Sequence, residues 1–321
     1  MREGNSVLAI SAEETARALE FGALIPALRE SLALGATAPP RHHHRLGDDA
    51  TLLIMPSWRG GLLGVKLVDV FPRNRSLGRP ALSSAYVLAS AETGEHLAVI
   101  DGNELTRRRT VATSALASSY LARPDSKVLL VVGTGHIGSL AAQAHAAVLG
   151  IETVLVYNRS RPGADALAAQ LRESGMDARV APDLDAAVAS ADVITCATLA
   201  SEPIIRGALL RPGTHLDLVG SFNRDLRESD DDCLRRGRLY VDAEVALDES
   251  GDLTRPLADG TITREDVVGT LPQLCRGEVP GRCGAEEITV FKAVGTSVAD
   301  LAAAGLVYTQ ASGARELRGN L

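Results

Sequence analysis

The sequence predicts an α/β protein with two domains, a parallel-sheet domain and an α+β domain. Between residues 121 and 295, short apolar strands alternate with helical segments, which is the pattern of βαβ units. A glycine-rich turn in "VVGTGHIG" follows the first of these strands and precedes a helix. Residues 1–120 contain strands in close succession, as in an antiparallel sheet. We expect residues 296–321 to return to this first domain as a helix.

Size and charge exclude several classes of protein. A chain of 321 residues is long enough for two domains with full cores. The net charge of −7 argues against a nucleic-acid-binding protein, which needs a basic face. No apolar run reaches the roughly 18–20 residues of a membrane span, and the first residues do not resemble a signal peptide. We therefore expect a cytoplasmic protein that binds neither nucleic acid nor membrane.

The cysteines favour a reducing compartment. No two of them form a CxxC pair, and no His/Cys spacing resembles a zinc site. A disulfide framework is improbable in a chain of this length. The consecutive histidines His42–His44 do not converge easily on one ion, so we predict no metal, although one of them could line a substrate entrance. The four cysteines are Cys196, Cys233, Cys275 and Cys283.

The first domain is predicted to begin with a helix. Ser11 and Glu14 form a capping-box pair, and apolar residues then recur at helical spacing until Gly35. A proline-broken basic loop follows, and then a strand at Thr51–Met55. The segments "GGLLGVKLVDVFP" and "SSAYVLASAETGEHLAVIDG" predict further strands, with "ETGE" as a hairpin turn, and "TRRRTVATSALASSYLA" predicts a helix.

One residue in these strands raises a question. Lys66 stands inside the apolar run "LLGVKLVDVF", and burying an unpaired ammonium group costs several kcal/mol or more. Its partner could be a structural carboxylate, such as Asp69, Asp101 or another acid, or it could be a ligand. Alternatively, the side chain could reach solvent.

The second domain carries the strongest motif. Gly133, Gly135 and Gly138 form GxGxxG directly between an apolar strand and a helix, which is the context of a Rossmann dinucleotide site. The N–H groups and the positive dipole end of that helix would face the cofactor phosphates. A glycine-rich turn in another α/β fold is the alternative. "EEITVFKAVGTSVADLAAAGLVY" is predicted to be the last helix, packed on the first domain.

The end of the second parallel strand bears on the choice of cofactor. An acidic residue at this position would bind the ribose of NAD(H), but "VLVYNRSR" has Asn158 there. Arg159 or Arg161 could pair with a 2′-phosphate, so we expect NADPH to be preferred, with NADH possible. The alternative is that these arginines only solvate a loop.

Four longer stretches resemble one family. These stretches are "GVKLVDVFPRNRSLGRP", "TGEHLAVIDGNELTRRRTVATSALASSYLAR", "VVGTGHIG" and "VFKAVGTSVADLAAA". They are similar to the ornithine cyclodeaminase/μ-crystallin family over most of the chain, from about residue 38 to 307. The resemblance implies a Rossmann domain of residues 121–295. It also implies a substrate-binding and dimerisation domain of residues 1–120 plus 296–321, and a homodimer.

The resemblance also implies roles for particular residues. Lys66 and Arg109 would grip a substrate carboxylate, together with Arg41 or its neighbour Arg45, and Lys66 could place a proton on the substrate nitrogen. For Arg109, surface charge at the start of a helix is the alternative. Arg109 and further residues would bind the cofactor: Ser84, Gly133, Thr134, Gly135, His136, Ile137, Gly138, Asn158, Arg159, Ser160, Ala197, Thr198, Val219, Gly220, Ser221, Lys292 and Val294.

The reaction itself depends on the stretch "HLDLVGSFNRDLRESD". Cyclodeaminases carry a catalytic aspartate two residues after the glycine that matches Gly220, but Phe222 stands there in this sequence. Phenylalanine cannot be a general acid or base. It could instead exclude water and pack on the methylene groups of the substrate. Asp225 is a weak candidate to replace the aspartate, and Glu228–Cys233 is interpreted as a solvated helix start.

The resemblance therefore favours the ketimine-reductase branch, bacterial 1-pyrroline-2-carboxylate/1-piperideine-2-carboxylate reductases. Such an enzyme reduces a cyclic imino acid to L-proline or L-pipecolate. Ornithine cyclodeaminase, an alanine-type amino-acid dehydrogenase and a non-catalytic NADPH-binding protein like μ-crystallin remain as alternatives. Ring size and pathway are left open, because they depend on pocket volume and context.

Overall fold

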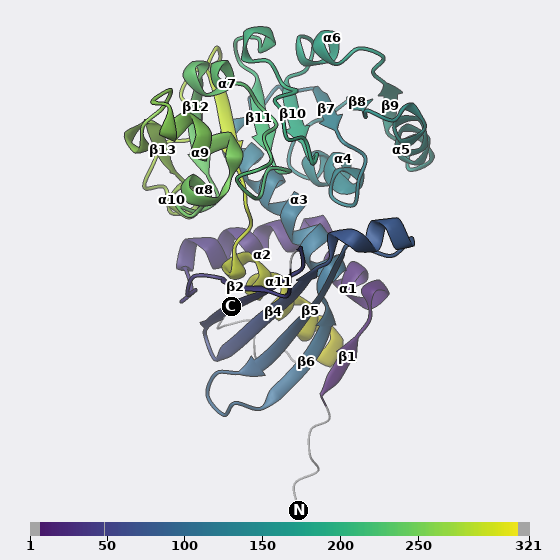
Figure 1. The fold of residues 1–321 in the computed structure, drawn as a ribbon, viewed down its shortest axis with the longest axis vertical. Coiled ribbons are helices and arrows are strands. Elements are labelled where there is room, and N and C mark those ends of the chain that lie inside the picture. Colours follow the sequence, from purple (N-terminus) through teal and green to yellow (C-terminus); the bar gives the residue numbers. More distant parts are fainter. Residues whose placement is uncertain (1–6, 48, 314–321) are drawn as a thin grey trace, which may run out of the picture. The chain divides into compact units, whose positions relative to one another are not determined.

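The computed structural model describes residues 7–47 and 49–313 (Figure 1). The described chain divides into two compact units, with one boundary between Arg109 and Thr110 and the other between Gly295 and Thr296. Unit 1 contains the residues before the first boundary and after the second, and unit 2 contains those between. The first boundary falls inside helix α3 (Gly102–Leu121). The sequence predicts the division between residues 120 and 121, at the end of the same helix. The outermost parts of the predicted first domain, 1–6 and 314–321, lie outside the described residues.

Unit 1 is built on a six-stranded sheet in the order β1-β6-β5-β4-β3-β2. The first strand pairs in parallel with β6, and every other pair is antiparallel. The predicted mostly antiparallel sheet is therefore confirmed. The turn "ETGE" joins the last two strands as expected. The strands are β1 (Leu8–Ile10), β2 (His42–Arg45), β3 (Thr51–Arg59), β4 (Leu62–Val70), β5 (Leu82–Ser90) and β6 (His96–Asp101).

The predicted first helix is in fact two, α1 (Ala12–Ala18) and α2 (Phe21–Leu34). The capping box of Ser11 and Glu14 is present as predicted. The helix breaks at Glu20, whose extended backbone begins α2. Side chains from elsewhere in the unit bind the carbonyls at the break: Gln310 donates to Ala18 O (3.0 Å) and Arg108 to Leu19 O (3.3 Å). Because these partners are distant in sequence, helical periodicity alone misses the break.

Two further sequence predictions are wrong. Residues 42–45, expected in a loop, form the exposed edge strand β2, which is fixed by antiparallel pairing with β3 rather than by its own sequence. The last predicted helix begins only at Ser297, as α11 (Ser297–Ser312). The preceding ITVFK is strand β14 (Ile288–Lys292), inserted between two parallel strands. A short apolar run does not distinguish a buried strand from a helix by periodicity. The predicted packing of α11 on the first domain is confirmed, because it contacts α2, β3 and β4.

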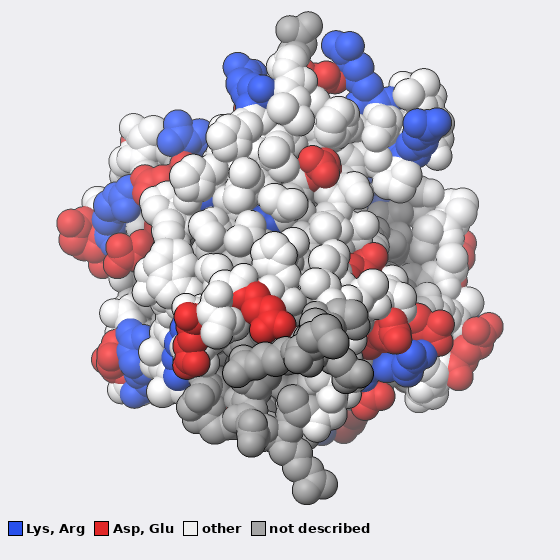
Figure 2. All heavy atoms as spheres, turned by 90° about the horizontal axis from the view of Figure 1, so that it is seen from below, with Lys and Arg blue, Asp and Glu red and all other residues white. Residues whose placement is uncertain are grey.

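The two faces of the unit 1 sheet differ in what covers them. Successive side chains of a strand point to opposite faces. The buried row Met55, Lys66, Tyr86 and Ile100 runs across four neighbouring strands, on the face that α11 covers. On the opposite face, the apolar row Pro56, Val65, Val87 and Val99 is only partly buried or exposed. Figure 2 shows the molecule from below, where uncharged side chains cover much of the visible surface and most charged groups lie toward its edge.

Unit 2 contains an eight-stranded, all-parallel sheet in the order β13-β12-β14-β11-β10-β7-β8-β9. The Rossmann-type prediction for this region is confirmed. Its strands are β7 (Val128–Val132), β8 (Thr153–Tyr157), β9 (Asp177–Val180), β10 (Val193–Cys196), β11 (His215–Leu218), β12 (Gly237–Val241), β13 (Val267–Thr270) and β14.

Helices cover both faces of this sheet. Leu129 and Val131 of β7 belong to one hydrophobic core, and the alternate residues Leu130 and Val132 belong to another. This is why β7 is a continuous apolar run. The helices are α4 (Gly138–Ala146), α5 (Arg161–Glu173), α6 (Leu184–Val188), α7 (Asp231–Arg236), α8 (Ala246–Glu249), α9 (Gly251–Ala258) and α10 (Leu271–Arg276). Three short 3₁₀ turns complete the described elements: Pro72–Leu77, Gly207–Leu209 and Arg264–Asp266.

Across residues 7–47 and 49–313, no helix combines the length and the apolar composition needed to cross a membrane.

Candidate active site

Lys66 has a buried partner in unit 1. The exposed fraction of its side chain is 2%, and its Nζ lies 2.7 Å from Asp300 Oδ2. The other oxygen of the same carboxylate, Oδ1, accepts a hydrogen bond from Arg109 Nε, also at 2.7 Å. We call Lys66, Arg109 and Asp300 the cation-rich cluster. Asp69 and Asp101, the acids considered from the sequence, are not this partner, and Arg109 is buried rather than a surface charge.

The charges in this cluster shift one another's protonation equilibria. Burial lowers the pKa of Lys66 to about 8; Asp300 opposes this shift, and Arg109 and Arg41 add to it. Burial alone would raise the pKa of Asp300. The Arg109 guanidinium and the Lys66 ammonium nevertheless hold that pKa below its usual value. The cluster therefore holds two cations and one carboxylate, with a third cation, Arg41, close enough to act on Lys66.

Local packing explains why the sequence reads "LLGVK" here. Lys66 lies opposite Tyr86 in the β4–β5 register. The hydroxyl of Tyr86 would lie only 1.9 Å from a Cβ atom at Gly64, so only glycine leaves room for that ring. Burial raises the pKa of the Tyr86 hydroxyl, so this group is neutral at the rim of the cluster. Gly102 has a similar role, since a Cβ there would lie 2.4 Å from Ser84 Oγ.

The remaining candidates of unit 1 lie before and in the edge strand β2 and in the inner strand β5. Arg41 is partly buried and precedes β2, whereas Arg45 ends that strand and is exposed. His42 and His44 point to the same side of β2, with parallel rings 6.3 Å apart. Ser84 donates a hydrogen bond to Leu67 O at 2.9 Å, beside Lys66 in β4.

Sequence reasoning missed Asp300. It is the only charged residue in the helix "SVADLAAAGLVYTQAS", just as Lys66 is the only cation in its apolar strand. A buried charge of each sign in apolar surroundings could have suggested the pair. What the sequence could not supply is that α11 packs on β4.

A cavity of about 390 Å³ lies in unit 2, at the carboxyl ends of β7, β8 and β10. These ends flank the point where the strand order reverses, which is where doubly wound sheets bind ligands. Of the predicted cofactor residues, the cavity brings together Gly133, Thr134, Gly135, Asn158, Arg159, Ala197 and Thr198. Its other lining residues are Val132, Tyr157, Leu184, Leu199, Ala200 and Ile204.

The three glycines of the fingerprint have three different environments. Gly133 has φ +97°, and a Cβ there would lie 2.6 Å from Ala197 O. A Cβ at Gly138 would lie 2.0 Å from Gly133 O, so this glycine lets the helix approach the strand. A Cβ at Gly135 would meet no atom within 4 Å. The open space beside Gly135 is what close approach of a pyrophosphate requires.

The start of α4 completes the phosphate-binding geometry. Its N-cap residue, Ile137, makes no side-chain hydrogen bond to the first turn. The positive dipole end of a helix and the N–H groups of its first residues favour an anion. At the end of β8, Asn158 Nδ2 donates to Ser160 O (3.1 Å). The cavity and this helix end fit a dinucleotide, and Asn158 and Arg159 would line its ribose end.

Glu228 corrects another sequence prediction. Helix α7 does begin in the acidic run, with Asp230 as its N-cap, but Glu228 is fully buried rather than solvated. Its Oε1 accepts hydrogen bonds from Thr198 N (2.7 Å) and Thr198 Oγ1 (2.8 Å). Its Oε2 accepts from Gly220 N (2.7 Å) and Ser221 N (3.2 Å). Glu228 thereby joins the segments that follow β10 and β11.

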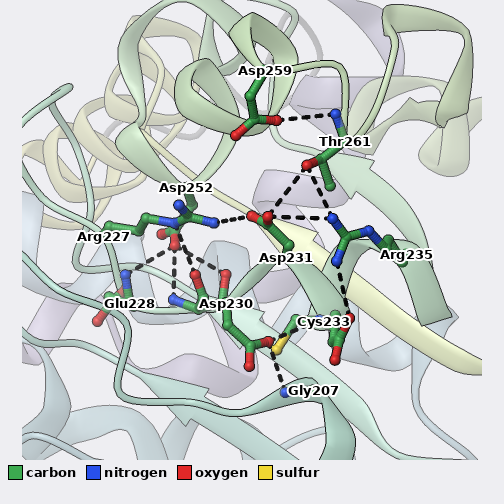
Figure 3. Close-up of polar contacts among 12 residues, drawn as sticks. Gly207, Arg227, Glu228, Asp230, Asp231, Cys233, Arg235, Asp252, Asp259 and Thr261 are labelled. Atoms are coloured by element: carbon green, nitrogen blue, oxygen red, sulfur yellow. Dashed lines mark hydrogen bonds and ion pairs between the residues drawn. The ribbon is translucent and has the colours of Figure 1, made fainter.

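A second buried acid and a buried lysine adjoin Glu228. Asp252 Oδ1 accepts a hydrogen bond from the backbone N–H of Glu228 at 2.9 Å (Figure 3). Its Oδ2 lies 3.5 Å from Lys292 Nζ, and both of these side chains are fully buried. We call Glu228, Asp252 and Lys292 the carboxylate-rich cluster. In the same view, Asp231 links Arg227 to Arg235.

The other predicted residues of unit 2 are placed as follows. Val219 and Ser221 are buried, and a Cβ at Gly220 would lie 1.9 Å from Thr198 O. Phe222 is 46% exposed. Val294 N donates to Asp242 Oδ2 at 3.0 Å. Lys292 contacts Asp252 inside the unit, so its predicted role beside the cofactor stays a prediction.

Comparison of the sequence with known proteins gives close matches over most of the chain. It is 42% identical over 316 residues to an uncharacterised protein of Schizosaccharomyces pombe, covering 93% of this chain and 96% of that protein. Protein SAR DEFICIENT 4 of Arabidopsis thaliana is 40% identical, with 85% and 86% covered. The Delta(1)-pyrroline-2-carboxylate reductase of Colwellia psychrerythraea is 35% identical, with 92% and 96% covered.

Solved structures match the whole fold. The Delta(1)-pyrroline-2-carboxylate reductase of Thermococcus litoralis, in complex with NADH and L-proline, has a TM-score of 0.91 and 31% identity, covering 96% of this chain and 98% of that one. An archaeal alanine dehydrogenase dimer with bound NAD has a TM-score of 0.90 and 28% identity, with 96% and 97% covered. The family model of ornithine cyclodeaminase/mu-crystallin matches residues 6–315. The chain therefore belongs to the ornithine cyclodeaminase/mu-crystallin family.

Proposed function

We propose that this protein is an NAD(P)H-dependent ketimine reductase. Its substrate would be a cyclic imino acid, 1-pyrroline-2-carboxylate and/or 1-piperideine-2-carboxylate, and its product L-proline or L-pipecolate. The observation that carries the proposal is the cation-rich cluster, in which two buried cations share one carboxylate with Arg41 close by. Such an excess of positive charge favours a small anionic ligand, because a substrate carboxylate would balance it.

The proposed reaction assigns a task to each side chain. Arg109 and Arg41 hold the substrate carboxylate, and Arg41 is favoured over the exposed Arg45 because its charge acts on Lys66. Lys66 donates a proton to the imine nitrogen as the C=N bond is reduced at C2. With a pKa of about 8, its ammonium group is a proton donor near neutral pH. The cofactor supplies the hydride.

Residues of unit 2 would orient the cofactor. The backbone of Gly133–Gly138 holds the pyrophosphate, and Ala197, Thr198 and Gly220 lie along the nicotinamide half. Asn158 and Arg159 would accept a 2′-phosphate, which supports a preference for NADPH. The absence of an acidic residue at the end of β8 adds to this argument.

We also propose a homodimer. The partly exposed apolar row Pro56, Val65, Val87 and Val99 on the outer sheet face is a surface suited to a second copy of the chain. The archaeal alanine dehydrogenase of similar fold is a dimer. Light scattering of the purified protein, which gives its mass, tests this.

The function is tested by following NADPH absorbance at 340 nm with each cyclic imino acid. We expect oxidation of NADPH with formation of L-proline or L-pipecolate, and slower oxidation of NADH. Parallel reactions contain ornithine with NAD, and pyruvate with ammonia and NADH. Release of ammonia from ornithine, or faster reduction of pyruvate than of the imines, would contradict the proposal.

A further inference from the structure

Asp300 is placed where two buried cations meet. It lies in the first turn of α11, it is fully buried, and each of its two oxygens contacts a different cation at 2.7 Å. Here the carboxylate fixes both the Lys66 ammonium and the Arg109 guanidinium, which come from β4 and α3.

The groups around Lys66 show how much depends on this one charge. Asp300 faces it from α11, Arg109 from α3 and Arg41 from the segment before β2. The charge of Asp300 also acts on the hydroxyl of Tyr86 in β5, and Ser57 of β3 lies beside that hydroxyl. Both hydroxyls are uncharged. Among the charges of the described residues that act on Lys66, Asp300 is therefore the one that favours the ammonium form.

We propose that Asp300 is a positioning residue for imine reduction, a built-in stand-in for the substrate carboxylate that keeps Lys66 protonated and holds Arg109 in place until substrate binds. This inference rests on the proposed function. Asp300 would contact neither the hydride nor the imine, and would act through Lys66. Asp300 and the substrate carboxylate would then compete for Arg109, and both would act on the charge of Lys66.

The competition leads to opposite effects on binding and turnover. In Asp300→Asn the shape is kept and the negative charge is lost, so a substrate-like carboxylate meets less repulsion and should bind at least as tightly. The same change removes the charge that opposes the lowering of the Lys66 pKa, so the proton is lost at lower pH. A residue with a merely structural role would weaken both binding and turnover when it is replaced.

The first experiment measures kcat/KM for imine reduction between pH 5.5 and 10. In the wild type we expect activity to fall as pH rises through about 8. In Asp300→Asn this fall should move down by about one pH unit or more, which gives a loss of about fivefold at pH 8 and of about tenfold at pH 9 and above. Asp300→Glu restores the charge and should bring the fall back toward the wild-type pH. Lys66→Arg should lower the rate, because arginine is a poor proton donor, and the residual activity should show no fall near pH 8, because arginine does not titrate in this range.

The second experiment measures binding at pH 6, where Lys66 is protonated. The probe is pyrrole-2-carboxylate, a planar five-membered ring carboxylate whose aromatic ring does not accept hydride. We expect its Kd for Asp300→Asn, measured by calorimetry, to equal or lie below the wild-type value. Weaker binding to a folded Asp300→Asn protein would overturn the proposal, as would an alkaline fall at the same pH in every variant.

Two outcomes separate this inference from the proposed function. If the wild type reduces no cyclic imine but Asp300→Asn binds the probe more tightly, the proposed function fails and the competition stands. If Asp300→Asn does not fold, Asp300→Glu and Lys66→Arg carry the test through the pH profile. An alkaline fall that persists near pH 8 in Lys66→Arg then contradicts the role of Lys66, and with it that of Asp300.

Discussion

The two buried clusters have opposite balances of positive and negative side chains. The cation-rich cluster of unit 1 has Lys66 and Arg109 against Asp300, and the carboxylate-rich cluster of unit 2 has Glu228 and Asp252 against a lysine. In unit 1 the carboxylate oxygens meet charged side chains. In unit 2 most of them accept hydrogen bonds from backbone N–H groups. An unbalanced positive charge is suited to a ligand, whereas carboxylates that bind the backbone hold the fold together.

The comparison is tested most strongly by the same substitution in both clusters. Lys292→Met removes the cation that lies 3.5 Å from Asp252 and whose charge acts on Glu228. Removal of one partner from a buried pair costs about 3–5 kcal/mol, so we expect a loss of stability of this size. Urea unfolding at pH 7 measures it. The control is Lys127→Met, whose exposed pair with Glu152 contributes about 1 kcal/mol or less. Equal losses in the two variants would contradict the comparison.

For Lys66→Met we expect the opposite result, a loss of activity with little loss of stability. Arg109 and Asp300 then remain as a balanced pair, so Asp300 is not left uncompensated and we expect no loss of stability above about 1 kcal/mol at pH 7. Imine reduction should fall at least about a hundredfold, through loss of the proton donor and of a carboxylate contact. Kinetics with the cyclic imines measure this loss. An unchanged Kd for NADPH would establish that unit 2 is intact.

The same variant tests a pH dependence. The pKa of Lys66 is about 8 in the folded protein and 10.5 in an ordinary lysine, so between these values the unfolded chain binds more protons. Stability contributed by this residue therefore rises with pH across that window, by up to about 3 kcal/mol. We expect the rise in the wild type and its absence in Lys66→Met. Unfolding midpoints that change equally in both proteins would mean that another group titrates.

The contrast between the clusters also marks what the sequence could predict. The strand, GxGxxG turn and helix of the cofactor site are contiguous, so local pattern was enough to place them. Lys66 was identifiable as an anomaly because it interrupts an apolar run. Its partner Asp300 was not, because α11 reaches β4 from the far end of the chain. Glu228 was interpreted as solvated because it begins an acidic run, although its backbone partners lie in the segments after two other strands.

Conversely, the sequence does not predict elements that depend on contacts with distant parts of the chain. Strand β14 is a strand because it lies between β11 and β12, and its five residues alone do not distinguish it from the start of α11. The break between α1 and α2 depends on carbonyl contacts to Arg108 and Gln310. In each case the missing information was a contact distant in sequence.

A smaller loss of stability than for Lys292→Met is expected for Glu228→Gln, which keeps the size of the side chain. Glutamine has one acceptor oxygen, whereas Glu228 uses one oxygen for Thr198 N and the other for Gly220 N and Ser221 N. The amide NH₂ must then face a backbone N–H group, and an unsatisfied buried donor costs about 1–3 kcal/mol. We expect a loss of stability in this range, measured by urea unfolding, with Glu286→Gln at an exposed position as control.

The consequence for function should be confined to unit 2. Because Glu228 joins the segments after β10 and β11, its replacement should loosen Thr198 and Gly220 and raise the KM for NADPH several-fold. Binding of pyrrole-2-carboxylate to the cation-rich cluster should not change. Weaker binding of pyrrole-2-carboxylate with an unaltered KM for NADPH would contradict these separate roles of the two clusters. It would mean that Glu228 supports substrate binding rather than cofactor binding.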